Sequence, residues 1–210
     1  MNIPKAALHN DIFRTLRERI IYGEYPPGMC LSEQGLCEEF KVSRTPLREA
    51  IRKLEEVKLV TAIPRYGTFV APIDINEVRS AFEVKIKLEG LAGALAARRI
   101  TPDKLEEMSR LIGEADRLEH RDLVKLDARF HEIIYQSAQN PILQEFLENV
   151  HSRCARLWVS TLSEVIPITD VVGQLRDLYL ALKDRDADRA DRVMQAHVQY
   201  FIERIKTQLL

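Results

Sequence analysis

Asp127, His131 and His197 are the side chains whose types and spacing best suit coordination chemistry. Asp127 and His131 lie four positions apart, so both project from the same face of a helix. Two ligands at this spacing, with a third from another helix, suit a transition metal, and neutral imidazole with carboxylate favours Zn, Ni or Mn. A buried carboxylate–imidazole hydrogen bond that holds no ion fits the same spacing. The sequence leaves both interpretations open.

A metal with open coordination positions can also activate water, so a metal-dependent hydrolase built on these three residues is the alternative function. The rest of the sequence offers no obvious general base, oxyanion donor or phosphate-binding glycine loop. Cys30, Cys37 and Cys154 follow no metal-ligand spacing, and we expect them to be small packed thiols in a reducing compartment. We therefore predict a protein that is not an enzyme.

A second set of residues suits nucleic-acid chemistry, because two stripes run along a predicted helix that begins near Ser43. The cationic stripe consists of Arg44, Arg48 and Arg52. The apolar stripe, on another side of the same helix, consists of Leu47, Ile51 and Leu54. A charged stripe is often only a solvent-exposed helix face that forms ion pairs, and nearby glutamates could supply the partners in this helix. In the major groove of DNA, arginine can instead read guanine O6 and N7 bidentately.

The elements around the arginine helix favour the DNA interpretation. A short helix with Ser32 as N-cap precedes it, and residues 41–43 form a tight turn between the two helices. Two β-prone runs follow, residues 59–63 and 68–70, joined by a turn with Arg65 at its tip and Gly67 at its end. This order predicts a winged helix-turn-helix, whose arginine helix enters the major groove while the wing and caps grip phosphates.

The remainder of the chain predicts an antiparallel bundle, so the fold class is mainly α. The predicted helices span about 74–99, 101–112, 122–138, 141–163, 167–183 and 186–206, with proline at several breaks. In the first, Val84, Leu88, Leu91 and Leu95 form an apolar stripe; in the fourth, we expect Leu143, Phe146, Val150, Cys154 and Leu157 to face inward. One boundary near Pro72 divides a DNA-binding domain, 1–72, from an effector-binding and dimerisation domain, 73–210.

The N-terminal part resembles the DNA-binding domain of the GntR family of bacterial transcriptional regulators. The resemblance is carried by Leu31-Ser32-Glu33, by Val42-Ser43-Arg44-Thr45-Pro46-Leu47-Arg48-Glu49-Ala50, by Leu54-Glu55 and by Gly67-Thr68-Phe69-Val70. It implies that Ser43, Arg44, Thr45, Arg48 and Gly67 contact DNA. Gln34 stands where some members carry a DNA-contacting arginine, and we add Arg52 and Arg65 as candidates. Lys58 stands where the family usually has glycine, which leaves the geometry of that turn open.

Residues 75–205 resemble the effector domain of the FadR subfamily, often called FCD. The matching segments are Glu83–Glu89, Ala94–Arg98, Asp127–His131, Asn140-Pro141, Ala181-Leu182, Asp186, Ala190 and His197. The resemblance implies a divalent metal that is held by one aspartate and three histidines and that anchors a small carboxylic acid. Asp127, His131 and His197 match three of these positions, but the fourth is Leu175, which cannot coordinate. Either three ligands hold the metal, or these residues bind the effector directly without one.

Two cations are candidates for binding an anionic effector. Lys85 occupies a slot where the subfamily often has arginine, and Arg153 lies between inward-facing positions of its predicted helix. A buried unpaired cation is costly, so either residue matters only if it is buried. The alternative for each is a solvated side chain that lies along the surface.

Bulk properties agree with a specific regulator. The net charge of the 210 residues is −1, and residues 1–73 carry 11 Lys+Arg against 9 Asp+Glu, so DNA affinity must come from where the cations lie. No apolar run reaches the length of a bilayer, and no secretory signal is visible, so we expect a cytoplasmic protein. We predict a homodimeric repressor that binds an inverted-repeat operator in double-stranded DNA and responds to a small organic acid.

Overall fold

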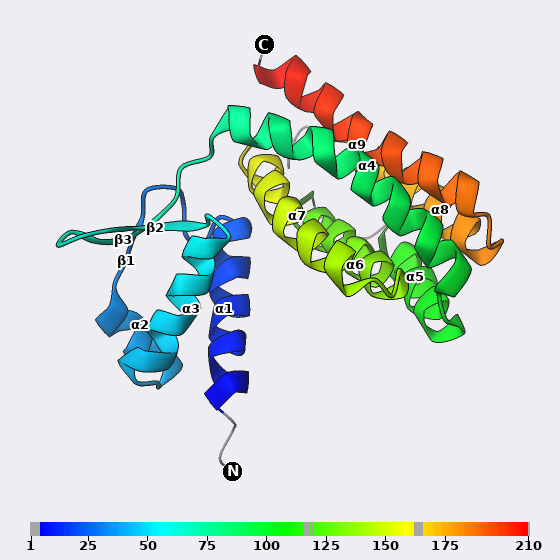
Figure 1. Cartoon of the computed structure of the whole chain (residues 1–210). Coiled ribbons are helices and arrows are strands. Elements are labelled where there is room, and N and C mark those ends of the chain that lie inside the picture. The colour runs from blue at the N-terminus through cyan, green and yellow to red at the C-terminus, as the bar shows by residue number, and fades with distance from the viewer. Residues whose placement is uncertain (1–4, 116–117, 119, 162–165, 210) are drawn as a thin grey trace. The chain divides into compact units, whose positions relative to one another are not determined.

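The chain folds into two compact units, residues 1–74 and residues 75–210 (Figure 1). The structure is a computed structural model that describes residues 5–115, 118, 120–161 and 166–209. It is mainly α-helical, as the sequence predicts. None of the helices that it describes combines the length and apolar character needed to span a bilayer.

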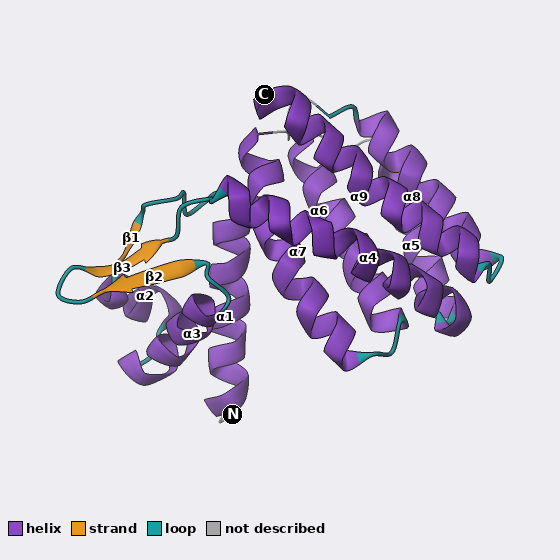
Figure 2. Ribbon diagram, turned by 45° about the horizontal axis from the view of Figure 1, so that its top comes forward, coloured by secondary structure: helices purple, strands orange, loops and turns teal. Residues whose placement is uncertain are grey.

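The first unit is a winged helix-turn-helix. Its helices are α1 (Lys5–Ile21), α2 (Glu33–Phe40) and α3 (Arg44–Glu56), and its strands are β1 (Cys30–Leu31), β2 (Val60–Ile63) and β3 (Gly67–Val70). The strands form one antiparallel sheet in the order β1-β3-β2, with Ile63 opposite Gly67 at the hairpin end (Figure 2). The apolar stripe of α3 is buried in a core that it shares with α1 and the sheet, as predicted: Ile12, Leu16, Ile20, Leu47, Ile51, Leu54, Leu59, Val60 and Val70.

Local hydrogen bonds explain the tight turn between α2 and α3. The hydroxyl of Ser32 accepts a hydrogen bond from the Gly35 N–H at 3.2 Å, which caps α2 as predicted. Lys41 ends that helix in the left-handed conformation, with φ of 54°, and the N–H of Val42 reaches back to the Cys37 carbonyl at 3.0 Å. Ser43 occupies the N-cap position of α3, but its side chain makes no capping hydrogen bond.

Lys58 adopts the conformation for which glycine is usually selected. Its φ is 58°, its N–H donates to the Glu55 carbonyl at 2.9 Å, and the Leu59 N–H donates to the Leu54 carbonyl at 2.8 Å. This pair of bonds is the Schellman arrangement that closes a helix C-terminus. The lysine therefore preserves the turn that leads from α3 into β2, at the steric cost of a Cβ in the left-handed region.

The second unit is a helical bundle with helices close to those predicted. They are α4 (Ile75–Arg99), α5 (Pro102–Glu114), α6 (His120–Ser137), α7 (Pro141–Thr161), α8 (Ile168–Lys183) and α9 (Ala187–Leu209). The predicted end of the fourth helix, at residue 163, lies outside the described residues. Helices α4 and α9 run side by side in both views (Figures 1 and 2). Gly93 permits this approach, because a Cβ there would lie 2.9 Å from the Ala190 carbonyl oxygen.

Leu143, Cys154 and Leu157 are buried as predicted, but Phe146 of the same set is not. Phe146, predicted to face inward, is 61% exposed. Val84 and Leu91 are 52% and 46% exposed, so their stripe on α4 is not the core face of that helix. The buried face of α4 instead carries Val78, Phe82, several glycines and alanines, and two charged residues, Lys85 and Glu89. Burial of this face is possible because the two opposite charges pair with each other, as described below.

Candidate functional site

The arginine stripe of α3 lies on the surface. Arg44, Arg48 and Arg52 are all exposed, on the side of α3 away from its buried residues. Arg48 Nε lies 3.0 Å from a carboxylate oxygen of Glu33, and Arg52 lies near two glutamates of its own helix. Among the described residues, Arg44 forms no ion pair. Exposed pairs of this kind contribute little to stability, so these guanidinium groups can exchange their partners for DNA at small cost.

The other predicted DNA contacts are also exposed. Gln34 lies on α2 and donates its amide to Glu38 at 3.0 Å. Ser43 and Thr45 are exposed at the start of α3. Arg65 and Gly67 lie in the exposed hairpin turn, both with positive φ, of 70° and 123°. A basic residue therefore stands at the tip of the hairpin, where a wing can meet a phosphate.

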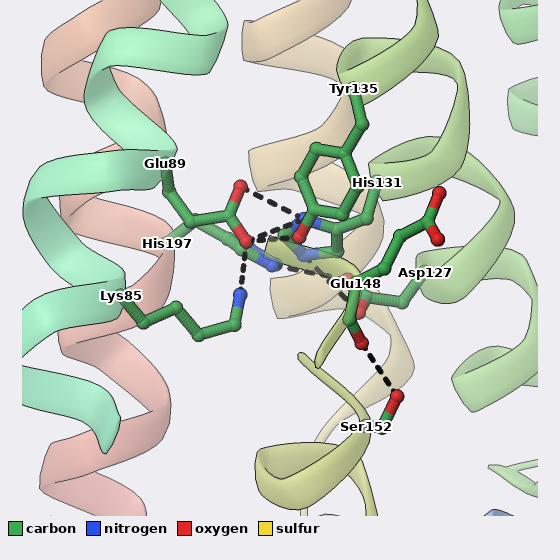
Figure 3. Close-up of polar contacts among 8 residues, drawn as sticks. All are labelled: Lys85, Glu89, Asp127, His131, Tyr135, Glu148, Ser152 and His197. Carbon is green, nitrogen blue, oxygen red and sulfur yellow. Dashed lines mark hydrogen bonds and ion pairs between the residues drawn. The ribbon is translucent and has the colours of Figure 1, made fainter. Parts of the chain in front are cut away.

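The bundle brings Asp127, His131 and His197 together from α6 and α9 (Figure 3). One carboxylate oxygen of Asp127 lies 3.0 Å from His197 Nε2, and the other lies 3.5 Å from His131 Nε2. All three residues are buried. Burial alone would raise the pKa of Asp127, but the two neighbouring imidazoles outweigh it and lower this pKa to about 2. The carboxylate is therefore ionised at neutral pH and available as a ligand.

The hydrogen bonds around the two histidines orient them for a metal. His131 Nδ1 lies 3.2 Å from a carboxylate oxygen of Glu89, and His197 Nδ1 lies 2.8 Å from the side-chain oxygen of Gln174. Both partners are acceptors, so each ring donates from Nδ1 and turns the lone pair of Nε2 toward Asp127. Asp127 Oδ1 and His197 Nε2 are buried and face each other at 3.0 Å, and neither has a further hydrogen-bond partner. A cation between these atoms would satisfy both, so the residues fit a divalent metal.

Glu89 joins α4 to this cluster and was missed by the sequence reasoning. It is fully buried and accepts hydrogen bonds from the Lys85 ammonium and the Tyr135 hydroxyl (Figure 3). Burial opposes its charge, but His131 and Lys85 hold the pKa of Glu89 well below its usual range. The signal in the sequence was the spacing of four between Lys85 and Glu89 and between His131 and Tyr135, which places each pair on one helix face.

His151 of α7 is a second residue that the sequence reasoning missed. Its ring centroid lies 4.7 Å from that of His131, and its Nδ1 is buried with no hydrogen-bond partner. The potential ligand atoms of His151 lie close to those of Glu89 and His131, and not in the group formed by Asp127, His131 and His197. Burial, His131 and Lys85 lower the pKa of His151 well below its usual range, so this imidazole is neutral at pH 7. The spacing of His151 along α7 gave no sign of this position.

A cavity of about 30 Å³ opens beside these residues. Its lining has a polar part, formed by Lys85, Asp127, His131, His151 and His197. The rest of the lining is formed by Phe82, Cys154, Ala155, Trp158, Val198, Phe201 and Ile205. The Phe201 ring lies 5.0 Å from the His197 ring and 4.5 Å from the Trp158 ring, measured between centroids. An apolar wall therefore begins directly at the histidine cluster.

The two predicted effector-binding cations have different surroundings. Lys85 lines the cavity and is 4% exposed, with Glu89 as its partner. Arg153 pairs with Glu77 of α4 and is not among the residues that line the cavity. Leu175 is buried on α8, and its neighbour Gln174 contacts His197. Gln174 therefore contacts His197 through its side-chain amide, next to the position where the resemblance implies a fourth metal ligand.

Comparisons with known proteins agree with both the winged helix-turn-helix and the helical bundle. Residues 8–70 match the family model for bacterial regulatory proteins of the gntR family, and residues 80–200 match the FCD domain model. The HTH-type transcriptional repressor RspR of Escherichia coli strain K12 is 28% identical, over 97% of this chain and 91% of that protein. The HTH-type transcriptional regulator YieP of the same strain is 31% identical, over 86% of this chain and 88% of that protein.

A solved structure shows the same fold over almost the whole length. Escherichia coli McbR/YncC superposes with a TM-score of 0.85 at 23% identity, and the match covers 97% of this chain and 99% of that one. The named relatives are transcriptional regulators rather than enzymes, which excludes the hydrolase alternative as the main function. FCD domains often bind metals, and the described residues of this chain include clusters of Asp, Glu and His that could hold one. The chain belongs to the GntR family of DNA-binding transcriptional regulators and carries an FCD effector domain.

Proposed function

We propose that this protein is a homodimeric repressor that binds an inverted-repeat operator and leaves it when a small carboxylic acid binds beside a metal in the helical unit. The observation that carries the proposal is the pairing of an exposed arginine helix in a winged unit with a preorganised Asp–His–His cluster. Because its target is chromosomal DNA, we place the protein in the cytoplasm. Sequencing of the DNA fragments that the purified protein retains identifies the operator.

In the proposed complex, α3 lies in the major groove of double-stranded DNA. Arg44 and Arg48 lie in its N-terminal half, from which a recognition helix reaches base edges. Ser43 and Thr45 at the start of α3, and Arg65 on the hairpin, contact phosphates. Arg48 exchanges Glu33 for DNA, and that exposed pair keeps the guanidinium extended while no DNA is bound.

The proposed metal is Zn, Ni or Mn, held by Asp127, His131 and His197. When bound, it supplies positive charge and open coordination positions for a carboxylate. Glu89 and Gln174 keep the two imidazoles in the ligating tautomer. Elemental analysis of protein reloaded with Zn or Ni tests this site. His131→Ala should lose stoichiometric metal, whereas His9→Ala, on α1 of the other unit, should retain it; equal metal content in both variants contradicts the site.

The proposed link between the two functions is α4. This helix begins at Ile75, directly after the first unit, and carries Glu89 to the Nδ1 atom of His131. A ligand that moves His131 or Lys85 therefore acts on the helix that follows the DNA-binding unit. Effector binding then favours a dimer in which the two α3 helices no longer match the half-site spacing. Operator release from metal-loaded protein, measured by fluorescence anisotropy, tests the link.

We place the dimer contact on the exposed apolar stripe of α4. Val84 and Leu91 belong to that stripe, and a two-fold dimer suits a two-fold operator. Phe146 on α7 is exposed as well and offers a second surface. Light scattering on Leu91→Glu and Phe146→Glu separates the two surfaces. We expect only the Leu91→Glu variant to be monomeric. If instead the Leu91→Glu variant is a dimer and the Phe146→Glu variant is a monomer, the dimer contact lies on α7.

A further inference from the structure

We infer that the effector is a small monocarboxylate with an apolar body, rather than a hydroxylated acid or a dicarboxylate. The inference deepens the function proposed above and rests on it, because it takes the metal and the cavity as the effector site. The charges around the cavity, the chemistry of its wall and its size each limit the effector in a different way.

The charges around the cavity favour a single carboxylate. Lys85 and Asp127 are the lining residues with a formal charge, and Glu89 neutralises Lys85. Histidines that ligate a metal are neutral, so Asp127 supplies the one negative charge of the metal-bound cluster. A divalent metal changes the net charge of the cluster to +1, which one carboxylate neutralises. A second carboxylate would leave an unpaired negative charge in a buried site, which is strongly unfavourable.

The wall beyond the histidines favours an apolar body. Phe82, Trp158, Val198, Phe201 and Ile205 supply most of it. In this wall, the Trp158 Nε1–H is a buried donor without a partner, so one acceptor oxygen could be satisfied there. The hydroxyl groups of a polyhydroxylated acid could not all find hydrogen-bond partners there. Each hydroxyl that is buried without a partner lowers the affinity by about tenfold. A polyhydroxylated acid is therefore a poor match for this cavity.

The size of the cavity favours a short molecule. A volume of about 30 Å³ holds roughly two water molecules. Even an acid with a short branched chain is larger than two water molecules, so the wall must move outward to admit it, and a longer acid would need a larger movement. Isobutyrate is therefore the reference probe. Glycerate and malonate are close to it in size but add hydroxyl groups or a second charge, respectively.

The test uses the full-length, zinc-loaded protein and these three acids. Trp158 is the single tryptophan of the chain and lines the cavity, so its fluorescence reports binding directly. We expect isobutyrate to bind at least about tenfold more tightly than glycerate or malonate. Neutral isobutyramide should bind weakly, because it lacks the charge that the metal attracts. Zinc content is measured after each titration, because malonate can also remove the metal.

A matched pair of variants tests the wall itself. Val198→Thr places a hydroxyl on the cavity wall without changing side-chain shape, and Val172→Thr makes the same change at a buried position of α8 outside the lining. Val198→Thr should narrow the ratio of the isobutyrate and glycerate affinities several-fold, and Val172→Thr should leave it unchanged. The ratio does not depend on stability, so a general loss of stability cannot imitate the effect.

The outcomes separate this inference from the proposed function. A chain that binds no zinc contradicts the proposed metal site, and the inference fails with it. Zinc-loaded protein that binds glycerate or malonate as tightly as isobutyrate overturns the inference alone. So does zinc-loaded protein that binds no isobutyrate at millimolar concentration, or a Val198→Thr variant with an unchanged affinity ratio.

Discussion

Replacing Glu89 with glutamine should destabilise the helical unit strongly, although the shape of the side chain hardly changes. Glu89 is fully buried and faces the Lys85 ammonium, which is itself 4% exposed. Removing one partner of a buried ion pair leaves an uncompensated charge and costs about 3–5 kcal/mol. The glutamine oxygen can still accept a hydrogen bond from Lys85 or Tyr135, so we expect a loss near about 3 kcal/mol.

A second substitution shows whether the unpaired ammonium group of Lys85 causes this loss of stability. In Glu89→Gln/Lys85→Met the buried charge is absent, and we expect about 2 kcal/mol of stability to return. The assay is urea unfolding of chelator-treated protein, followed by the fluorescence of Trp158 in α7, the one tryptophan of the chain. A loss below about 1 kcal/mol in the single variant, or a double variant less stable than the single one, would refute the reasoning.

Four further substitutions have clear expected results. Lys58→Gly removes the backbone strain of a lysine in the left-handed conformation, with φ of 58°. The first unit should become about 0.5–1 kcal/mol more stable, as measured by thermal unfolding. Gly93→Ala should cost about 1–3 kcal/mol, because the added Cβ meets the Ala190 backbone, whereas Gly113→Ala, with open space, should gain up to about 1 kcal/mol. The lowered pKa of His151 means that the unfolded chain binds a proton first as pH falls through 6.5. Stability of the metal-free protein should therefore decline below that pH, at up to about 1.4 kcal/mol per unit for this group, and His151→Gln should weaken the decline.

The helices, the winged unit and the arginine stripe could be predicted because local signals specify them. Ser32 caps α2, and the buried residues of α3 repeat with the helix period. The exposed stripe of α4 could not be predicted, because periodicity shows that Val84 and Leu91 share a face but not whether that face meets the core. The true inner face carries Lys85 and Glu89, a pair that a hydrophobicity pattern assigns to the surface.

The site was predictable only in part, for a related reason. Asp127 and His131 lie on one helix, so their spacing of four indicates a shared face, and His197 on the last predicted helix is the third candidate ligand. His151 reaches the cluster from α7 through tertiary packing, which leaves no pattern in the chain, and Glu89 of α4 is marked only by its spacing of four from Lys85. Gln174 likewise gains its role only because α8 packs against α9. The residues that orient the two histidines are therefore harder to find in the sequence than the candidate ligands themselves.

The proposed regulation requires that α3 reads the operator. Fluorescence anisotropy on the recovered operator measures this directly for Arg44→Ala and Arg48→Ala, with Arg110→Ala, an exposed arginine of α5, as the control. Each α3 variant should lose about 1–3 kcal/mol of specific binding, and the control should bind like the unmodified protein. Unchanged operator affinity in both α3 variants, with circular dichroism that shows intact helices, would contradict the account.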